Sequence, residues 1–245
     1  MKEKKEKIVL IVIAAIVVAL FLKPLCKPLF KSHQEEVGSK KKKMHFPKKV
    51  SDLTFYAVQY EKDAVDMVFD SMKTCRLSVG TMRKAIGLLQ KSVSIDKKYL
   101  LGYTTLIQYQ SQIRDYDGAF KTFHEAEKWL PEDPLIAEFG GFLYDITGKK
   151  QLADNEYQIS ISYLDKRLNA KFDVSDAISK SIMISFLKDN KEALASLKKE
   201  STGRHYDAKD SASLKMGIEA LETNSFHRND IVNNEMTNSM IKFNL

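Results

Sequence analysis

The chain has 245 residues, a formal net charge of +7 and 44% apolar residues, a composition that excludes a disordered chain. Residues 1–50 contain 13 Lys against 4 Glu, a net +9, whereas residues 51–245 contain 26 basic and 28 acidic side chains, a net −2. Because the basic excess lies entirely in the first fifth of the chain, the near-neutral remainder excludes a broad surface for the phosphates of a nucleic acid.

An apolar run without any charge occupies residues 8–22, directly after Lys2, Lys4, Lys5 and Lys7. A helix of this length spans about 22 Å, and the apolar residues just after it can extend the span toward the roughly 30 Å of a bilayer core. The run is either an uncleaved signal anchor or a cleaved signal peptide. No small-residue cleavage site follows it, so we expect a cytoplasmic stub and transmembrane helix over residues 1–30.

A basic segment without apolar periodicity follows and is expected to be a linker over residues 31–54. The lysines at 40–43 are either a solvated part of this linker or a contact for anionic lipid head groups. Positive residues on both sides of the apolar run leave the orientation open. A short basic N-terminus usually stays inside, which favours a single-pass protein of the bacterial inner membrane with its main domain facing the periplasm.

The rest of the chain repeats at a period of 34 residues. A small residue is followed four positions later by a large one and, after three more, by a second small one. These positions are Ala85, Leu89 and Ser92, then Ala119, Phe123 and Ala126, then Ala153, Tyr157 and Ser160. Proline and glycine are sparse here, which favours helices. A helical hairpin of this length cannot bury its apolar face alone, so the pattern indicates stacked hairpins.

The repeat resembles the tetratricopeptide repeat (TPR) family, most clearly in the helix start at residues 115–119 and the closing Pro131. The resemblance implies an all-α fold, in which an α-solenoid of about four TPR-like hairpins follows the anchor. We expect this domain over residues 55–223, a capping helix over residues 211–223 and a weakly structured tail over residues 224–245. About six inserted residues near 168–174 separate the third and fourth hairpins.

In TPR proteins the leading helix of each hairpin lines a concave groove that binds a peptide or helix of a protein partner. The resemblance places six residues of the second and third hairpins in this groove: Thr104, Gln108, Gln112, Glu138, Phe142 and Asp145. Met67, Asp70 and Thr74 follow from the degenerate first hairpin. The set is polar and partly acidic with one aromatic residue, so it suits a partner segment with basic and apolar side chains.

No sequence pattern for catalysis is present: there is no Gly-x-Ser-x-Gly, no phosphate-binding glycine loop and no His-Glu-x-x-His. The five histidines are dispersed, and Cys26 and Cys75 form no metal-binding pattern. We therefore expect no enzyme activity, cofactor or metal. Trp129 is expected in the core between hairpins.

Anchor, linker and repeat together predict a membrane-anchored interaction scaffold that assembles or stabilises a membrane or envelope complex. The alternative is an immunity protein that neutralises a toxic enzyme at the membrane.

Overall fold

A computed structural model describes residues 50–74, 77–223 and 228, and every regular element in these residues is an α-helix, which confirms the all-α class. The expected membrane anchor at residues 1–30 lies outside the described residues. Within the described part, no helix is both long and apolar enough to cross a membrane. The helices are α2 (Val50–Lys73), α3 (Val79–Ile95), α4 (Leu100–Gln112), α5 (Tyr116–Trp129), α6 (Pro134–Ile146), α7 (Lys150–Ala170), α8 (Val174–Leu187), α9 (Asn190–Ser201) and α10 (Ala208–Glu222).

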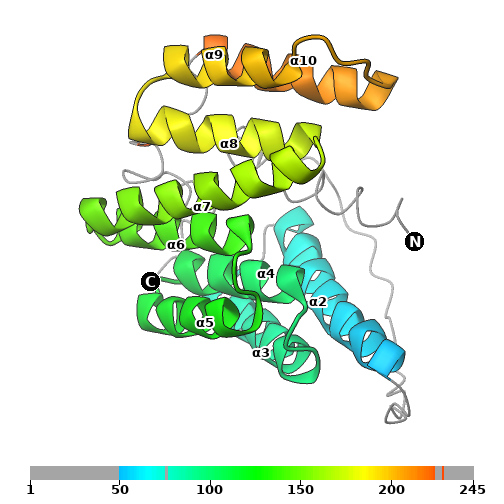
Figure 1. Ribbon diagram of the computed structural model, residues 1–245. Helices are drawn as coiled ribbons and strands as arrows, with labels where there is room; N and C mark the ends of the chain where they lie inside the picture. The colour runs from blue at the N-terminus through cyan, green and yellow to red at the C-terminus, as the bar shows by residue number, and fades with distance from the viewer. Residues whose placement is uncertain (1–49, 75–76, 224–227, 229–245) are drawn as a thin grey trace.

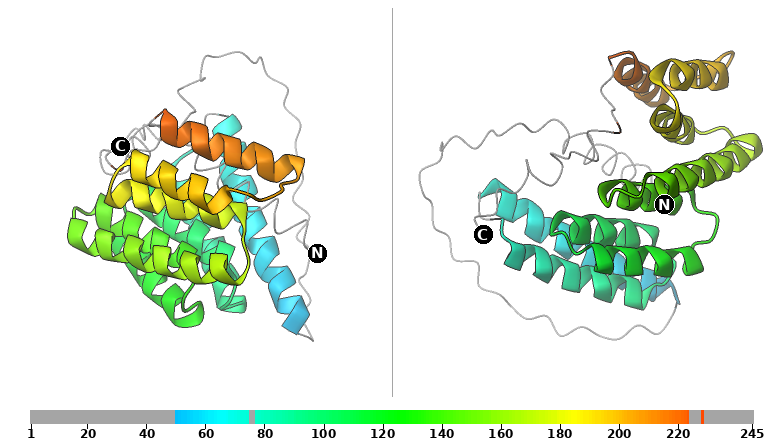
Figure 2. Two further views of the ribbon diagram at one scale, coloured as in Figure 1. Left: turned by 45° about the horizontal axis from the view of Figure 1, so that its top comes forward. Right: turned by 90° about the vertical axis from the view of Figure 1, so that its left-hand side faces the viewer.

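The helices stack in chain order, from α2 and α3 at one end to α9 and α10 at the other (Figures 1 and 2). Each helix packs mainly on its neighbours in sequence, and α10 covers α8 and α9 at the position expected of a capping helix. At the other end, α2 begins at Val50 and so includes residues up to 54 that the sequence places in the linker.

The positions that repeat every 34 residues form the buried contacts between helices. All nine residues at these positions are buried, with at most 1% of their surface exposed, and the two serines among them are fully buried. Each serine hydroxyl donates a hydrogen bond to a carbonyl of the preceding helix, Ser92 to Ala57 at 2.6 Å and Ser160 to Pro134 at 2.9 Å. Small residues therefore mark the places where two helix backbones approach closely.

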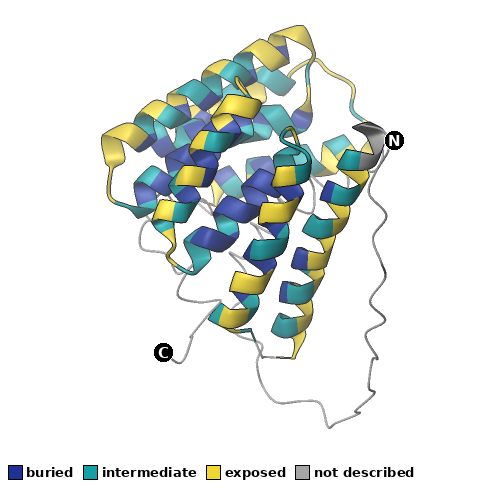
Figure 3. Cartoon of the chain, turned by 90° about the horizontal axis from the view of Figure 1, so that it is seen from below, coloured by how far each residue is buried: buried dark blue, intermediate teal, exposed yellow. Residues whose placement is uncertain are grey.

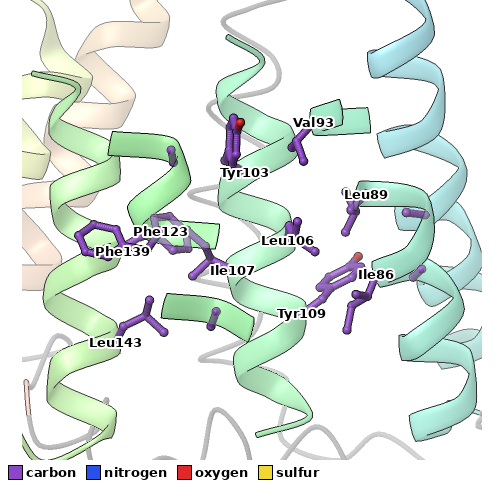
Figure 4. Packing of buried hydrophobic residues seen from close by; sticks show 14 of the residues in the cluster. Ile86, Leu89, Val93, Tyr103, Leu106, Ile107, Tyr109, Phe123, Phe139 and Leu143 are labelled. Carbon is purple, nitrogen blue, oxygen red and sulfur yellow. The ribbon is translucent and has the colours of Figure 1, made fainter. Parts of the chain in front are cut away.

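The apolar core is divided into three clusters along the stack. The largest joins α2 to α6, and Figure 4 shows Phe123 and Phe139 beside Ile107, and Ile86 and Leu89 facing the side of α4 that carries Tyr109. A second cluster joins α7 to α8 with contributions from α6, and a third joins α7 to α10. Buried residues line the faces that helices turn toward one another, and exposed residues lie outside (Figure 3).

The insertion between the third and fourth hairpins lengthens a helix. The helix α7 has 21 residues, whereas α5, its counterpart one period earlier, has 14. The added two turns are anchored by Leu168, which is buried, and by an ion pair from Arg167 to Asp176 of α8 at 2.9 Å. The inserted residues therefore connect the third hairpin to the fourth through a longer helix.

A residue in the left-handed backbone conformation follows the end of α4, and another follows the end of α6 one repeat period later. After α6, the amides of Gly148 and Lys149 donate to the carbonyls of Asp145 and Tyr144 at 2.9 and 2.8 Å. This pair of hydrogen bonds is the Schellman motif, which requires a positive φ at the first of these residues, and Gly148 has a φ of 76°. Arg114 occupies the same place after α4 with a φ of 60°, although a Cβ atom makes this conformation unfavourable.

Trp129 does not occupy the core position predicted for it. This last residue of α5 is 44% exposed, because the helix ends there and Leu130 turns inward in its place.

Candidate functional site

The three predicted groove residues of α6 share one face of that helix, since Glu138, Phe142 and Asp145 are spaced four and three residues apart. Glu138 and Asp145 are buried and Phe142 is half-buried. On α4, Thr104 is buried and its hydroxyl donates to the carbonyl of Leu101, while Gln108 and Gln112 are half-buried.

The structure brings a cation to Asp145, the last of the six predicted residues. Both carboxylate oxygens of Asp145 accept hydrogen bonds from the guanidinium of Arg228, from Nε at 2.8 Å and from Nη2 at 2.6 Å. The side chain of Asp145 is only 2% exposed and that of Arg228 is 13% exposed. This two-point geometry is the strongest form of carboxylate–guanidinium pairing.

The remaining donors of Arg228 also have acceptors. Nη1 donates to the carboxylate of Asp154 and to the carbonyl of Phe186, the latter at 3.2 Å. Nη2 additionally lies 3.4 Å from the carbonyl of Lys150. The guanidinium has five N–H groups, so each of them has an acceptor in this pocket. Burial alone opposes the charge, but the hydrogen bonds to Asp145 and Asp154 outweigh it and raise the pKa of Arg228 above its usual value.

The pocket lies where the C-terminal ends of two helices meet the start of a third. Asp145 is in the last turn of α6, Phe186 is in the last turn of α8, and Asp154 follows the start of α7. The last carbonyls of a helix have no partner within it and carry the negative end of the helix dipole. Two such ends and two carboxylates favour a cation in the pocket, and the positive end of the α7 dipole offsets only part of this effect.

Aromatic rings form the apolar wall of the pocket. The ring of Tyr157 lies 5.3 Å from the guanidinium carbon of Arg228, within the range of a cation–π contact, and its hydroxyl donates to Asp145 at 2.7 Å. Burial first, and then the charge of Asp145, raise the pKa of this phenol. Behind it, Phe142 and Phe186 pack on Tyr157 with ring centroids 6.0 and 5.4 Å away.

A glycine of α6 makes room for the Tyr157 ring. A Cβ atom on Gly141 would lie 2.2 Å from a ring carbon of Tyr157, closer than any real contact. The position one period earlier is Ile107, and there the corresponding Phe123 lies instead against Gly140 of the next hairpin. The small residue at 141 therefore fixes the ring whose hydroxyl orients Asp145.

Glu138 contributes a second acidic group on the same face. Burial, and then the nearby charge of Asp133, raise the pKa of Glu138 from its ordinary 4.5 to about 8. The carboxyl is therefore protonated near neutral pH in the folded protein, so it adds little negative charge to the neighbouring pocket.

A separate polar cleft of about 390 Å³ lies between α3, α4 and α5. An ion pair from Lys97 to Glu125 at 2.5 Å and a hydrogen bond from Thr122 to Gln110 at 2.9 Å cross its lining. None of the six predicted groove residues lines this cleft. The described residues also contain no group of three or more His, Cys, Asp or Glu placed to bind a metal ion.

The TPR resemblance placed Asp145 and Phe142 in a groove but did not predict the other contributors to the pocket, which include the backbone carbonyl of Phe186. Asp154 has no counterpart in the repeat pattern, and Tyr157 was assigned to the core alone. Arg228 lies in the segment expected to be weakly structured, 83 residues from Asp145. The one available signal was that Arg228 is the only arginine after residue 204.

Comparison of the chain with protein-family models, with curated proteins and with solved structures finds no match.

Proposed function

We propose that this protein is a membrane-anchored interaction scaffold, a TPR-like solenoid that binds a basic segment of a protein partner. The partner segment lies along the face of α6 and places a cationic side chain in the pocket of Asp145. The observation that carries the proposal is the pairing of a nearly buried carboxylate with a guanidinium at a position where the TPR resemblance implies groove residues.

The repeat pattern supports the solenoid part of this proposal. Small and large residues 34 positions apart are buried between successive helices, and α10 covers the last hairpin. Arrays of this kind leave one face free along their length, which is the usual binding surface of repeat proteins.

Capture of partners from membranes by the full-length tagged chain tests the binding role. Asp154→Ala is the informative variant, because Asp154 contacts the guanidinium but is 35% exposed, so its loss should not prevent folding. Asp117→Ala removes an exposed acid from the first turn of α5 and is the matched control. We expect weaker capture with Asp154→Ala alone. Equal capture by both variants and the wild type would contradict binding through this pocket.

The captured partner also decides between the two roles that the sequence suggests. Components of a membrane or envelope complex support the scaffold, and a toxic enzyme supports the immunity protein. Reporter domains fused after residue 50 test the proposed bacterial inner-membrane location, with activity in the periplasm as the expected result.

A further inference from the structure

We infer that Asp145, Asp154, Tyr157 and the carbonyl of Phe186 form a binding site selective for an arginine side chain. Arg228 fills this site within the same chain, and an arginine of the partner replaces it in the complex. The second part rests on the proposed function, whereas the selectivity and the competition are properties of this chain alone.

The geometry of the pocket selects arginine over lysine. Two acceptors face Nε and Nη2 side by side on one carboxylate, and further acceptors face Nη1 from Asp154 and Phe186. An ammonium group has three donors that diverge from one atom, so it cannot pair with both oxygens of Asp145 and also reach the other acceptors. The flat guanidinium also fits against the face of Tyr157.

The walls of the site do not depend on Arg228. Asp145 is held by its position on α6 and by the hydroxyl of Tyr157, and Tyr157 is held by Gly141 and Phe186. Arg228 follows the last helix, α10, whose own contacts are with α8 and α9. When Arg228 leaves, a buried carboxylate remains without a cation, a costly state that favours binding of another guanidinium.

The site also opens to solvent at one edge. Asp154 is 35% exposed and Arg228 is 13% exposed, so the guanidinium can be exchanged on the side of Asp154. Because Arg228 is part of the same chain, it competes at a high effective concentration. Removal of Arg228 should therefore raise the affinity for an added arginine about fivefold or more, since the fraction of open sites increases.

Argininamide is the probe that tests this inference, with binding followed by calorimetry and by the melting temperature of the full chain in detergent. For Arg228→Gln we expect a rise in melting temperature of about 3–5 °C at a concentration tenfold above the dissociation constant. The wild type should need about fivefold more argininamide for the same response. Lysinamide should not raise the melting temperature of either protein. Arg204→Gln is the matched control, because Arg204 is an exposed arginine that contacts Phe172 and Glu200 outside the site, and it should behave as the wild type.

Adding Asp145→Asn to Arg228→Gln should abolish the argininamide response. Equal responses of wild type and Arg228→Gln, or equal responses to argininamide and lysinamide, would overturn the inference. If Arg228→Gln does not fold, Arg228→Lys keeps the positive charge and serves for the same titration. An argininamide response that requires Asp145, together with partner capture that ignores Asp154, would support the arginine site and reject only the proposed function.

Discussion

At the scale of single residues, the pocket depends on how one buried carboxylate is compensated. Both oxygens of Asp145 accept hydrogen bonds from Arg228, and Oδ2 also accepts one from the hydroxyl of Tyr157. The resemblance to the TPR family placed Asp145 and Phe142 on one face of α6. It could not predict Arg228, because a contact across 83 residues leaves no local pattern in the sequence.

Two buried tyrosines should respond differently to loss of the hydroxyl group. Tyr157→Phe removes a hydrogen bond to a charged group and should lower the free energy of unfolding by about 1.5–3 kcal/mol. Tyr103 is also fully buried, but its hydroxyl is the one buried side-chain polar atom without a hydrogen-bond partner among the described residues. Tyr103→Phe should therefore be neutral or stabilising by about 1 kcal/mol.

Urea unfolding of the two tyrosine variants and the wild type measures this contrast. An equal loss of stability in both variants would show that ring packing, and not the hydrogen bond to Asp145, sets the effect.

Glu138 predicts a pH dependence of stability. Its pKa is about 8 when folded against an ordinary 4.5, so the folded state holds a proton that the unfolded state has lost between these values. The unfolding free energy should therefore decrease as pH rises from about 4.5 to 8. Glu138→Gln cannot ionise, so it should match the wild type near pH 5 and exceed it by on the order of a few kcal/mol near pH 8.5.

Chemical unfolding at both pH values tests the Glu138 prediction, with Glu219→Gln on the exposed side of α10 as the control. An advantage of Glu138→Gln that is the same at pH 5 and pH 8.5 would argue against a buried, protonated carboxyl.

At the scale of the helix and its turn, the 34-residue period predicted which residues are buried between helices better than it predicted where the helices begin and end. Ala119, Phe123 and their equivalents are buried as the period requires. The sequence shows an insertion near residue 170 but does not show whether the inserted residues are helical, since helical residues and loop residues can both add length. Leu168 and Arg167 continue α7 because each has a contact on α8 or beyond.

Substitutions at the two helix ends, at Arg114 and Gly148, should change the stability of the protein in opposite directions. Gly148→Ala places a Cβ at a φ of 76° and should destabilise by about 1–2 kcal/mol. Arg114→Gly relieves the same conformation at a φ of 60° and should stabilise, although greater freedom of the unfolded chain reduces the gain to about 0.5–1 kcal/mol. Thermal melting of the two variants checks the signs, and a loss of stability on Arg114→Gly would contradict the account.

At the scale of the whole molecule, the buried apolar side chains form one cluster at each end of the stack and a smaller one between them, and the smaller cluster meets the first at Tyr144. One cluster unites α2 to α6, and another, which contains Leu197 and Leu221, unites α7 to α10. The all-α class followed from the scarcity of proline and glycine together with the period. The extent of each cluster could not be predicted, because the period locates the inserted residues but does not show that they lengthen α7.

The clusters at the two ends of the stack share no residue, which predicts local effects of core substitutions. Leu197 and Leu89 are both fully buried, in different clusters. Replacing either with Ala should lower the free energy of unfolding of the helices around it by about 2–5 kcal/mol. We expect Leu197→Ala to speed hydrogen exchange in α8 to α10 and to leave α3 to α5 unchanged. Leu89→Ala should have the greater effect on α3 to α5. Uniform acceleration along the chain by Leu197→Ala would show a single cooperative unit.

The distance in sequence between the pocket and Arg228 also bears on synthesis of the chain. Asp145 leaves the ribosome 83 residues before Arg228, an interval of about 4–16 s at ordinary rates of translation. The pocket is complete only after Phe186 has also left the ribosome, 42 residues before Arg228, so for about 2–8 s a nascent chain with α6 to α8 folded carries an acidic pocket that Arg228 does not yet fill. If a partner binds as we propose and is present at the site of synthesis, it would meet no competition from Arg228 in that time, so we expect assembly during translation to be favoured over assembly after release.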